Sequence, residues 1–174
     1  MLGAITGDII GSIYEFNNIK TKNFNLFTDK NYFTDDTVMS FAVAEALMNG
    51  SKSEDFIRFM KRYGVLYPRA GYGGTFFSWL FSNTTEPYNS WGNGSAMRVA
   101  PCGWIAKLSE HFEEGLKLTE NLAKKSAEVT HNHPEGIKGA QATAAAIFFM
   151  LHGKSKKTIE EYKNKLKDYI QNKY

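Results

Sequence analysis

The chain has 174 residues, of which 43% are hydrophobic and 14% aromatic, so a buried core is expected and intrinsic disorder is not. Its 21 basic and 18 acidic side chains leave a net charge of +3, which argues against a protein that specifically binds nucleic acid. The single cysteine, Cys102, excludes an internal disulfide and a cysteine-rich zinc site. Because the start, MLGAITGDII, lacks the basic residues of a signal peptide and no segment reaches the length of a membrane span, we expect one soluble, cytoplasmic domain over residues 1–174.

The first predicted helix covers residues 2–16 and carries two stripes. Glycines recur every four residues, and polar residues follow one another at +4 and +3, so each set lies on one face of the helix. These residues are Gly3, Gly7 and Gly11, and Asp8, Ser12 and Glu15. The glycine stripe predicts either close packing of another helix or approach of a ligand to the backbone. Glu15, between two aromatic residues, is a candidate general base or metal ligand, or else a solvated helix end.

Residues 33–37 read FTDDT and lead into an apolar segment, residues 37–49, that predicts a buried helix. Asp36 or Thr37 at the start of this helix would be an ordinary N-cap, and a nearby acid complements the helix dipole. Two acids flanked by hydroxyl groups also offer the hard oxygens that Mg²⁺ prefers, which makes Thr34, Asp35 and Asp36 candidate metal ligands. Taken alone, the motif favours the cap over the metal site, because helix caps are so common.

Two glycine-rich loops, AGYGGT (residues 70–75) and WGNGSAMR (residues 91–98), lie in the middle of the chain. Glycine permits positive φ and leaves backbone N–H groups bare, so such a loop can bind a phosphate at the start of a helix. Neither loop has the pattern of a P-loop or a Rossmann fold. Each could equally be a plain turn.

The second half of the chain is predicted to be helical. A helix from Ser95 is expected to be disturbed by Pro101 and Gly103, an amphipathic helix covers residues 112–131, and another starts at the proline of THNHP (residues 130–134). The two histidines of THNHP could bind a transition metal or hydrogen-bond a ligand. With a lysine-rich amphipathic helix at the end, the patterns predict an all-α array of about seven helices.

Five segments occur in one order along the chain: GAITGDIIGSIYE, FTDDT, GYGG, GNGSAMRVAP and THNHPEGIKGAQATAAAI. Together they resemble the ADP-ribosylglycohydrolase family, over nearly all of residues 1–153. The resemblance implies an all-α multi-helix bundle that binds two divalent ions, Mg²⁺ or, in some members, Mn²⁺. It also implies cleavage of the bond between ADP-ribose and a protein side chain or a small molecule, so the partner would be an ADP-ribosylated protein or an ADP-ribose-containing small molecule.

The resemblance also implies roles for particular residues. Thr34, Asp35 and Asp36 match a metal-ligand motif of the family. Glu15 matches a glutamate near the ions, and with Asp35 and Asp36 it would form the catalytic centre. The residues that would bind ADP-ribose lie in the two glycine loops and in THNHP; they are Gly71, Gly73, Gly74, Asn93, Gly94, Ser95, Met97 and His131.

The chain departs from the family pattern in its C-terminal part. The family has a second metal motif, D-x-D-T, and none of the six aspartates here is paired in this way. Half of a two-ion site is therefore expected, whether the chain is a fragment, a natural short form, or one copy of a homo-oligomer that completes the core. The predicted function is a Mg²⁺-dependent ADP-ribosyl hydrolase, with a non-catalytic module that binds ADP-ribose or a nucleotide diphosphate as the alternative.

Overall fold

A computed structural model describes residues 1–153 and 156–173, and this part of the chain is all-α, as predicted. It contains nine α-helices and one 3-10 helix, more than the predicted seven, partly because the helix expected from Ser95 is divided in two. No strand occurs within these residues. None of their helices is long and apolar enough to cross a membrane.

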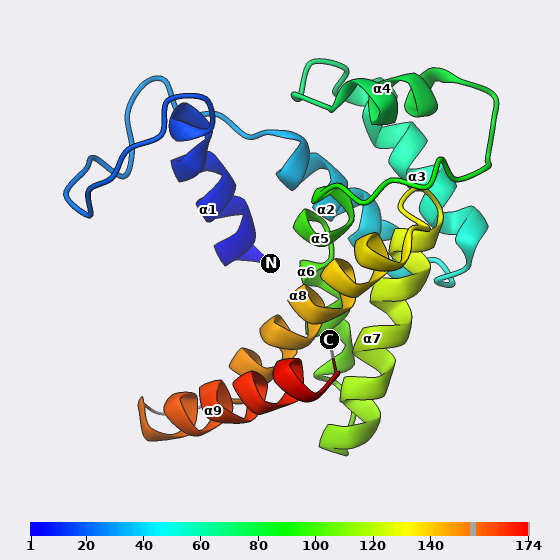
Figure 1. Cartoon of the computed structure of the whole chain (residues 1–174). Helices are drawn as coiled ribbons and strands as arrows, with labels where there is room; N and C mark the ends of the chain where they lie inside the picture. Colours follow the sequence, from blue (N-terminus) through cyan, green and yellow to red (C-terminus); the bar gives the residue numbers. More distant parts are fainter. Residues whose placement is uncertain (154–155, 174) are drawn as a thin grey trace.

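Helix α1 (Leu2–Gly11) stands to one side of the other helices (Figure 1). It is shorter than predicted, because the 3-10 helix η1 (Ser12–Tyr14) replaces its last turn and the Ser12 hydroxyl donates a hydrogen bond to the Ile9 carbonyl. No residue of α1 is buried, and a side chain at any of its three glycines would meet nothing within 4 Å. Close helix packing, the first of the two reasons predicted for the glycine stripe, is therefore wrong.

Helix α2 (Asp35–Met48) lies at the centre of the larger core. It is apolar on nearly all sides, and eight of its residues are buried, as its sequence predicted. It packs against α3 (Ser53–Leu66) and α6 (Ala100–Ala106). The chain turns sharply away after α2 at Gly50, whose φ of +121° suits glycine.

Two short helices carry the glycine loops. Helix α4 (Gly74–Phe81) begins inside GYGG, and α5 (Gly94–Met97) begins inside GNGSAM. Pro101 lies in the first turn of α6, where a backbone N–H has no partner within the helix, so the N–H that proline lacks is not missed. The helix expected from Ser95 is thus interrupted just before Pro101, as predicted, and Pro101 itself lies in the first turn of the second piece.

The long helices α7 (Phe112–Glu128) and α8 (Pro134–His152) pack side by side, and α9 (Lys156–Lys173) lies against α8. A second, aromatic core forms where Phe148 and Phe149 of α8 meet α9. Helix α8 also contacts α5 and α6. Its start therefore brings THNHP next to the second glycine loop.

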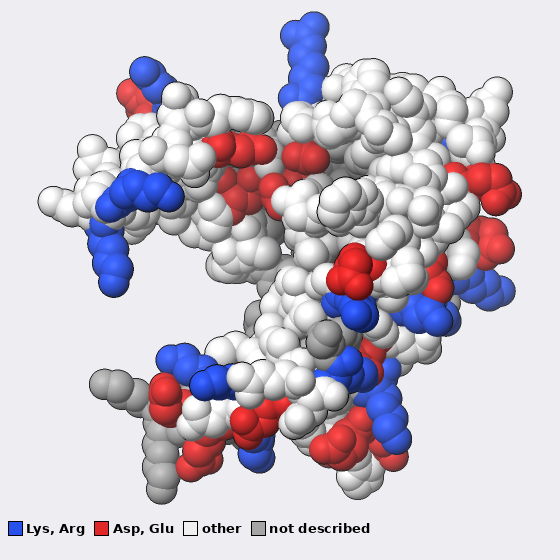
Figure 2. Space-filling view, viewed as in Figure 1, with Lys and Arg blue, Asp and Glu red and all other residues white. Residues whose placement is uncertain are grey.

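The space-filling view shows a deep hollow between α1 and the lower helices α8 and α9 (Figure 2). Acidic side chains gather on the wall above this hollow, where α1 meets the start of α2 (Figures 1 and 2). The fold thus places the FTDDT motif at an open concave surface.

Candidate functional site

Asp8 of α1 holds the start of α2 in place. Its carboxylate accepts hydrogen bonds from the backbone N–H groups of Thr34, at 2.8 Å, and Thr37, at 3.2 Å. It also accepts from both hydroxyls, at 2.6 Å from Thr34 and at a short contact from Thr37. An acid from another helix thus satisfies N–H groups that a helix start leaves unpaired. The sequence placed Asp8 on the polar face of the first helix but indicated no role for it.

Thr34 is the N-cap of α2, so the prediction of a cap at Asp36 or Thr37 is wrong. The Thr34 hydroxyl donates to Asp8 and accepts the Asp36 N–H at 3.3 Å, and the side chain is 3% exposed. Ligation of an ion by the same oxygen would use its remaining lone pair. Thr34 therefore acts first as a cap that orients the two acids.

The two acids of FTDDT face different cavities. Asp36 lines a first cavity of about 390 Å³, whereas Asp35 lines a second of about 240 Å³. Burial raises the pKa of both carboxyls. The charge of Asp36 contributes to a pKa of about 6 for Asp35. The charge of Asp8 likewise raises the pKa of Asp36. A cation bound by these carboxylates would relieve this repulsion.

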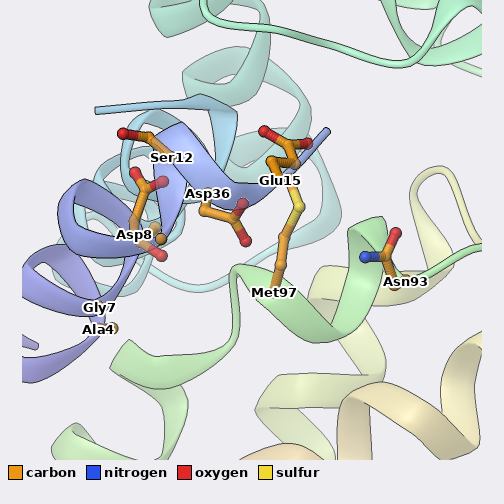
Figure 3. Close-up of a pocket in the computed structure, with 10 residues that line it drawn as sticks. Ala4, Gly7, Asp8, Ser12, Glu15, Asp36, Asn93 and Met97 are labelled. Carbon is orange, nitrogen blue, oxygen red and sulfur yellow. The ribbon is translucent and has the colours of Figure 1, made fainter. Parts of the chain in front are cut away.

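The first cavity lies between α1 and α5. Figure 3 shows Asp8, Asp36 and Glu15 on one side of it, and Asn93 and Met97 of the second glycine loop on the other. Two glycines of α1 also line it, so a ligand here would meet bare backbone. This arrangement agrees with the approach of a ligand to the backbone, which was the second reason predicted for the glycine stripe.

Glu15 reaches this cavity from its rim. It is exposed, and its neighbour Phe16 is 83% exposed. The aromatic shielding considered from the sequence is therefore not formed by Phe16. Glu15 remains open to water, which suits a group that exchanges protons with solvent better than one held in an apolar pocket.

The second cavity gathers three segments that the sequence predicted to share a ligand. Its wall includes Asp35 and residues from GYGG, GNGSAM and THNHP, namely Gly73, Gly74, Asn93, Gly94, Met97 and His131. Asn93 and Met97 line the first cavity as well, so the two cavities adjoin there. The acids and the glycine loops thus border one continuous region.

Two predicted substrate residues line neither cavity. Gly71 has a φ of +99° and forms the turn that brings GYGG against FTDDT, where the Asp35 N–H donates to the Ala70 carbonyl at 2.7 Å. Ser95 is buried, and its hydroxyl donates to the Gly136 carbonyl at 2.8 Å. Both residues therefore position the loops in this structure.

The described residues offer an incomplete set of ligands for a divalent ion. Nowhere among them do three or more His, Cys, Asp or Glu side chains form a group that could hold a metal. Mg²⁺ takes six oxygens, several of which commonly come from water or from a bound ligand. Asp35 and Asp36 fit part of such a set, and the other oxygens would have to come from water, ligand or further protein.

Arg98 lies beneath the second cavity and was not predicted as a site residue. It is 1% exposed, and none of the ion pairs found in residues 1–153 and 156–173 includes it. Its guanidinium donates to the Ser126 carbonyl at 2.6 Å and to the Thr130 hydroxyl at 2.8 Å. The one available signal was an arginine inside an apolar segment, AMRVAP, where a charge is costly.

Comparison with known proteins agrees with this geometry. The model of the ADP-ribosylglycohydrolase family matches residues 1–173. The chain belongs to this family. The resemblance read from the five motifs is thereby confirmed, as is the all-α fold.

Similar proteins include the ADP-ribosylhydrolase ARH3 of several vertebrates. The chain is 28% identical to that of Homo sapiens, and the alignment covers 89% of the chain and 50% of the relative. It is 29% identical to that of Mus musculus, and the alignment covers 89% of the chain and 49% of the relative. It is 33% identical to that of Gallus gallus, and the alignment covers 70% of the chain and 35% of the relative. The chain thus spans about half the length of these curated relatives.

Gly94 lies beside the His131 ring in the wall of the second cavity, and this proximity yields a prediction. A Cβ at Gly94 would lie 3.0 Å from the Nε2 of His131 and 3.2 Å from its Cε1. Gly94→Ala is therefore expected to narrow the cavity and to weaken by about tenfold or more the binding of a ligand that occupies it, with ADP-ribose as the probe. Isothermal titration calorimetry checks the affinity, and thermal unfolding checks that the fold is kept.

Gly139→Ala serves as the control. Gly139 lies inside α8, and a Cβ there would meet nothing within 4 Å. This variant is expected to be slightly more stable than the parent, with unchanged affinity. Equal affinities for the parent and the Gly94 variant would contradict the placement of a ligand against His131.

Proposed function

We propose that this chain supplies the ADP-ribose cleft and one part of a divalent-metal site of a hydrolase that removes ADP-ribose from a modified protein or a small molecule. The observation that carries the proposal is the second cavity, where three separate motifs meet beside the Asp35 carboxylate. Family membership and the name ADP-ribosylhydrolase, carried by relatives of about twice the length, support the same reaction.

The second cavity suits a diphosphate. Gly73 and Gly74 stand at the start of α4, where unpaired backbone N–H groups and the helix dipole favour an anion. The buried cation of Arg98 lies on the same wall and adds positive potential. The rest of the ligand would then extend toward Asn93 and Met97, where the cavities adjoin.

The acids suit the chemistry of a ribosyl bond. Breaking that bond develops positive charge at the anomeric carbon, as in glycoside hydrolysis. Asp35, in the second cavity, and Asp36, in the first, would stabilise this charge. Mg²⁺ or Mn²⁺, when bound by these acids, would polarise ribose oxygens and lower the pKa of a water. Glu15, open to solvent at the rim, would orient the attacking water and accept its proton.

A non-catalytic module that binds ADP-ribose is the second candidate. The incomplete set of metal ligands in the described residues favours it for this chain. Both candidates require the second cavity to bind ADP-ribose, and they differ in whether the glycosidic bond is cleaved.

We expect the chain to bind ADP-ribose in calorimetry and His131→Ala to weaken that binding by about tenfold or more, since a group in the cavity wall is lost. His133→Ala is the matched control, because the His133 Nδ1 accepts the Glu135 N–H at the start of α8 and the side chain does not line the cavity. This control should lose some stability and keep its affinity.

Release of free ADP-ribose from a modified protein, measured with and without Mg²⁺, separates the two candidates. Metal-dependent release supports the hydrolase, and binding without release supports the module. A chain that neither binds nor releases ADP-ribose would contradict both.

A further inference from the structure

The geometry points to a tautomer-setting relay beneath the second cavity: Arg98 and Thr130 hold His131 as a neutral imidazole whose Nε2–H points at the ligand. His131 would then act as a fixed hydrogen-bond donor that reads an acceptor atom of the bound nucleotide, and Arg98 and Thr130 are positioning residues that act through it. The identity of the ligand rests on the proposed function, whereas the tautomer does not.

The relay is a chain of two buried hydrogen bonds. The Arg98 guanidinium donates to the Thr130 hydroxyl at 2.8 Å, and that oxygen lies 2.8 Å from the Nδ1 of His131. All three side chains are at most 4% exposed. Because water is excluded from these contacts, each polar hydrogen needs a protein acceptor.

The direction of the second bond follows from the donors available. Arginine only donates, so the Thr130 oxygen must accept from Arg98. Among the described residues, the hydroxyl hydrogen then has one hydrogen-bonding neighbour that can accept it, the Nδ1 of His131. If Nδ1 carried a proton instead, the hydroxyl hydrogen would be left buried and unpaired, which is unfavourable. Nδ1 therefore accepts, and in a neutral ring the proton lies on Nε2.

The Nε2 atom faces the second cavity. His131 lines that cavity, and Nε2 lies close to Gly94 and Gly92 on its wall. Nε2 takes part in no hydrogen bond within the described residues. If it were also fully buried, it would count among the buried polar atoms of these residues that lack a partner, and it does not. It is therefore accessible from the cavity and available to a ligand.

The surroundings of the ring favour its neutral form. Burial and the positive charge of Arg98 lower the pKa of His131 to about 4. The other titratable groups that face it are Tyr88, whose ring centroid is 5.8 Å away, and Asp35 across the cavity. At neutral pH the ring would thus carry one ring proton, and the relay decides which nitrogen holds it.

The cost of burying Arg98 also agrees with a functional role. A fully buried cation without an acidic partner is unfavourable, and among the described residues the Nε of Arg98 has no hydrogen-bond partner. An apolar residue of similar volume would pack into this core without that penalty. The arrangement is explained if the guanidinium is there to direct the Thr130 hydroxyl toward His131.

The first test is the tautomer of the free protein. Nitrogen-15 NMR of the imidazole side chains at neutral pH, with His131 assigned from the His131→Gln variant, reports which ring nitrogen carries the proton. The expected spectrum shows an unprotonated Nδ1 and a protonated Nε2. A protonated Nδ1 would overturn the inference, whatever the ligand proves to be.

The second test removes the hydroxyl. Thr130→Val is expected to change the nitrogen-15 shifts of His131 toward a mixture of tautomers and to weaken ADP-ribose binding about 3- to 10-fold. Thr130→Ser keeps the hydroxyl and is expected to restore both readouts. If Thr130→Val leaves the shifts and the affinity unchanged, the relay is wrong.

Thr119→Val is the matched control for the loss of a buried hydroxyl. Thr119 is fully buried, and its hydroxyl donates to the Gly115 carbonyl within α7, away from the cavity. This variant should lose stability as Thr130→Val does, while the His131 spectrum and the affinity stay the same. If the parent itself does not bind ADP-ribose, the proposed ligand is wrong, and the spectra of the free proteins still decide the relay.

Discussion

Replacing Asp8 by alanine is expected to lower the free energy of unfolding by about 2–4 kcal/mol and to free helix α1 from the rest of the protein. Asp8 accepts four hydrogen bonds from Thr34 and Thr37, and α1 has no buried residue that could hold it otherwise. The N–H groups at the start of α2 would lose their carboxylate. Chemical denaturation measures the stability, and hydrogen exchange at the Thr34 and Thr37 amides measures the local release.

Asp29→Ala is the control for this change. Asp29 is exposed in the loop between α1 and α2, so the variant is expected to stay within about 0.5 kcal/mol of the parent. Asp8→Asn should fall between the two, because one amide oxygen can still accept. If amide protection at Thr34 and Thr37 is unchanged in Asp8→Ala, the assignment of Asp8 as the anchor of α1 is wrong.

Replacing Asp35 by asparagine is expected to stabilise the protein above about pH 6 and to have little effect below about pH 4. Burial and the charge of Asp36 raise the pKa of Asp35 in the folded protein from 3.8 to about 6. Between these values the folded protein keeps a proton that the unfolded chain releases, so the stability of the parent falls as pH rises. Asparagine removes this loss. Thermal unfolding across that pH range measures the difference.

The Asp35 and Asp36 carboxylates also predict an effect of Mg²⁺ on stability. At neutral pH, Mg²⁺ should raise the melting temperature of the parent, because the ion binds the folded state and relieves the repulsion between Asp35 and Asp36. Asp35→Asn or Asp36→Asn is expected to weaken Mg²⁺ binding by about tenfold or more in calorimetry. Asp29→Asn is the control, and unchanged affinity in both site variants would contradict the metal assignment.

Much of the fold follows from local pattern. The apolar residues of α2 predicted a buried helix, and α8 begins at the proline of THNHP, as expected. These features depend on residues a few positions apart, and helix periodicity and caps act over that range. Local pattern was weaker at two helix ends. Helix α1 gives way to a 3-10 helix at Ser12, whose hydroxyl accepts the Tyr32 N–H, and α6 starts at Ala100 instead of continuing the helix expected from Ser95.

The sequence by itself determined the family, through the order of five motifs. Nine of the twelve residues that it proposed for the site line one of the two cavities. Only the tertiary structure decided that Asp8 anchors FTDDT, that Asp35 and Asp36 face different cavities, and that Arg98 reaches His131 through Thr130. The Asp8–Thr34 and Arg98–Thr130 hydrogen bonds join residues 26 and 32 positions apart. They depend on how whole helices pack, and periodicity within one helix carries no information about that.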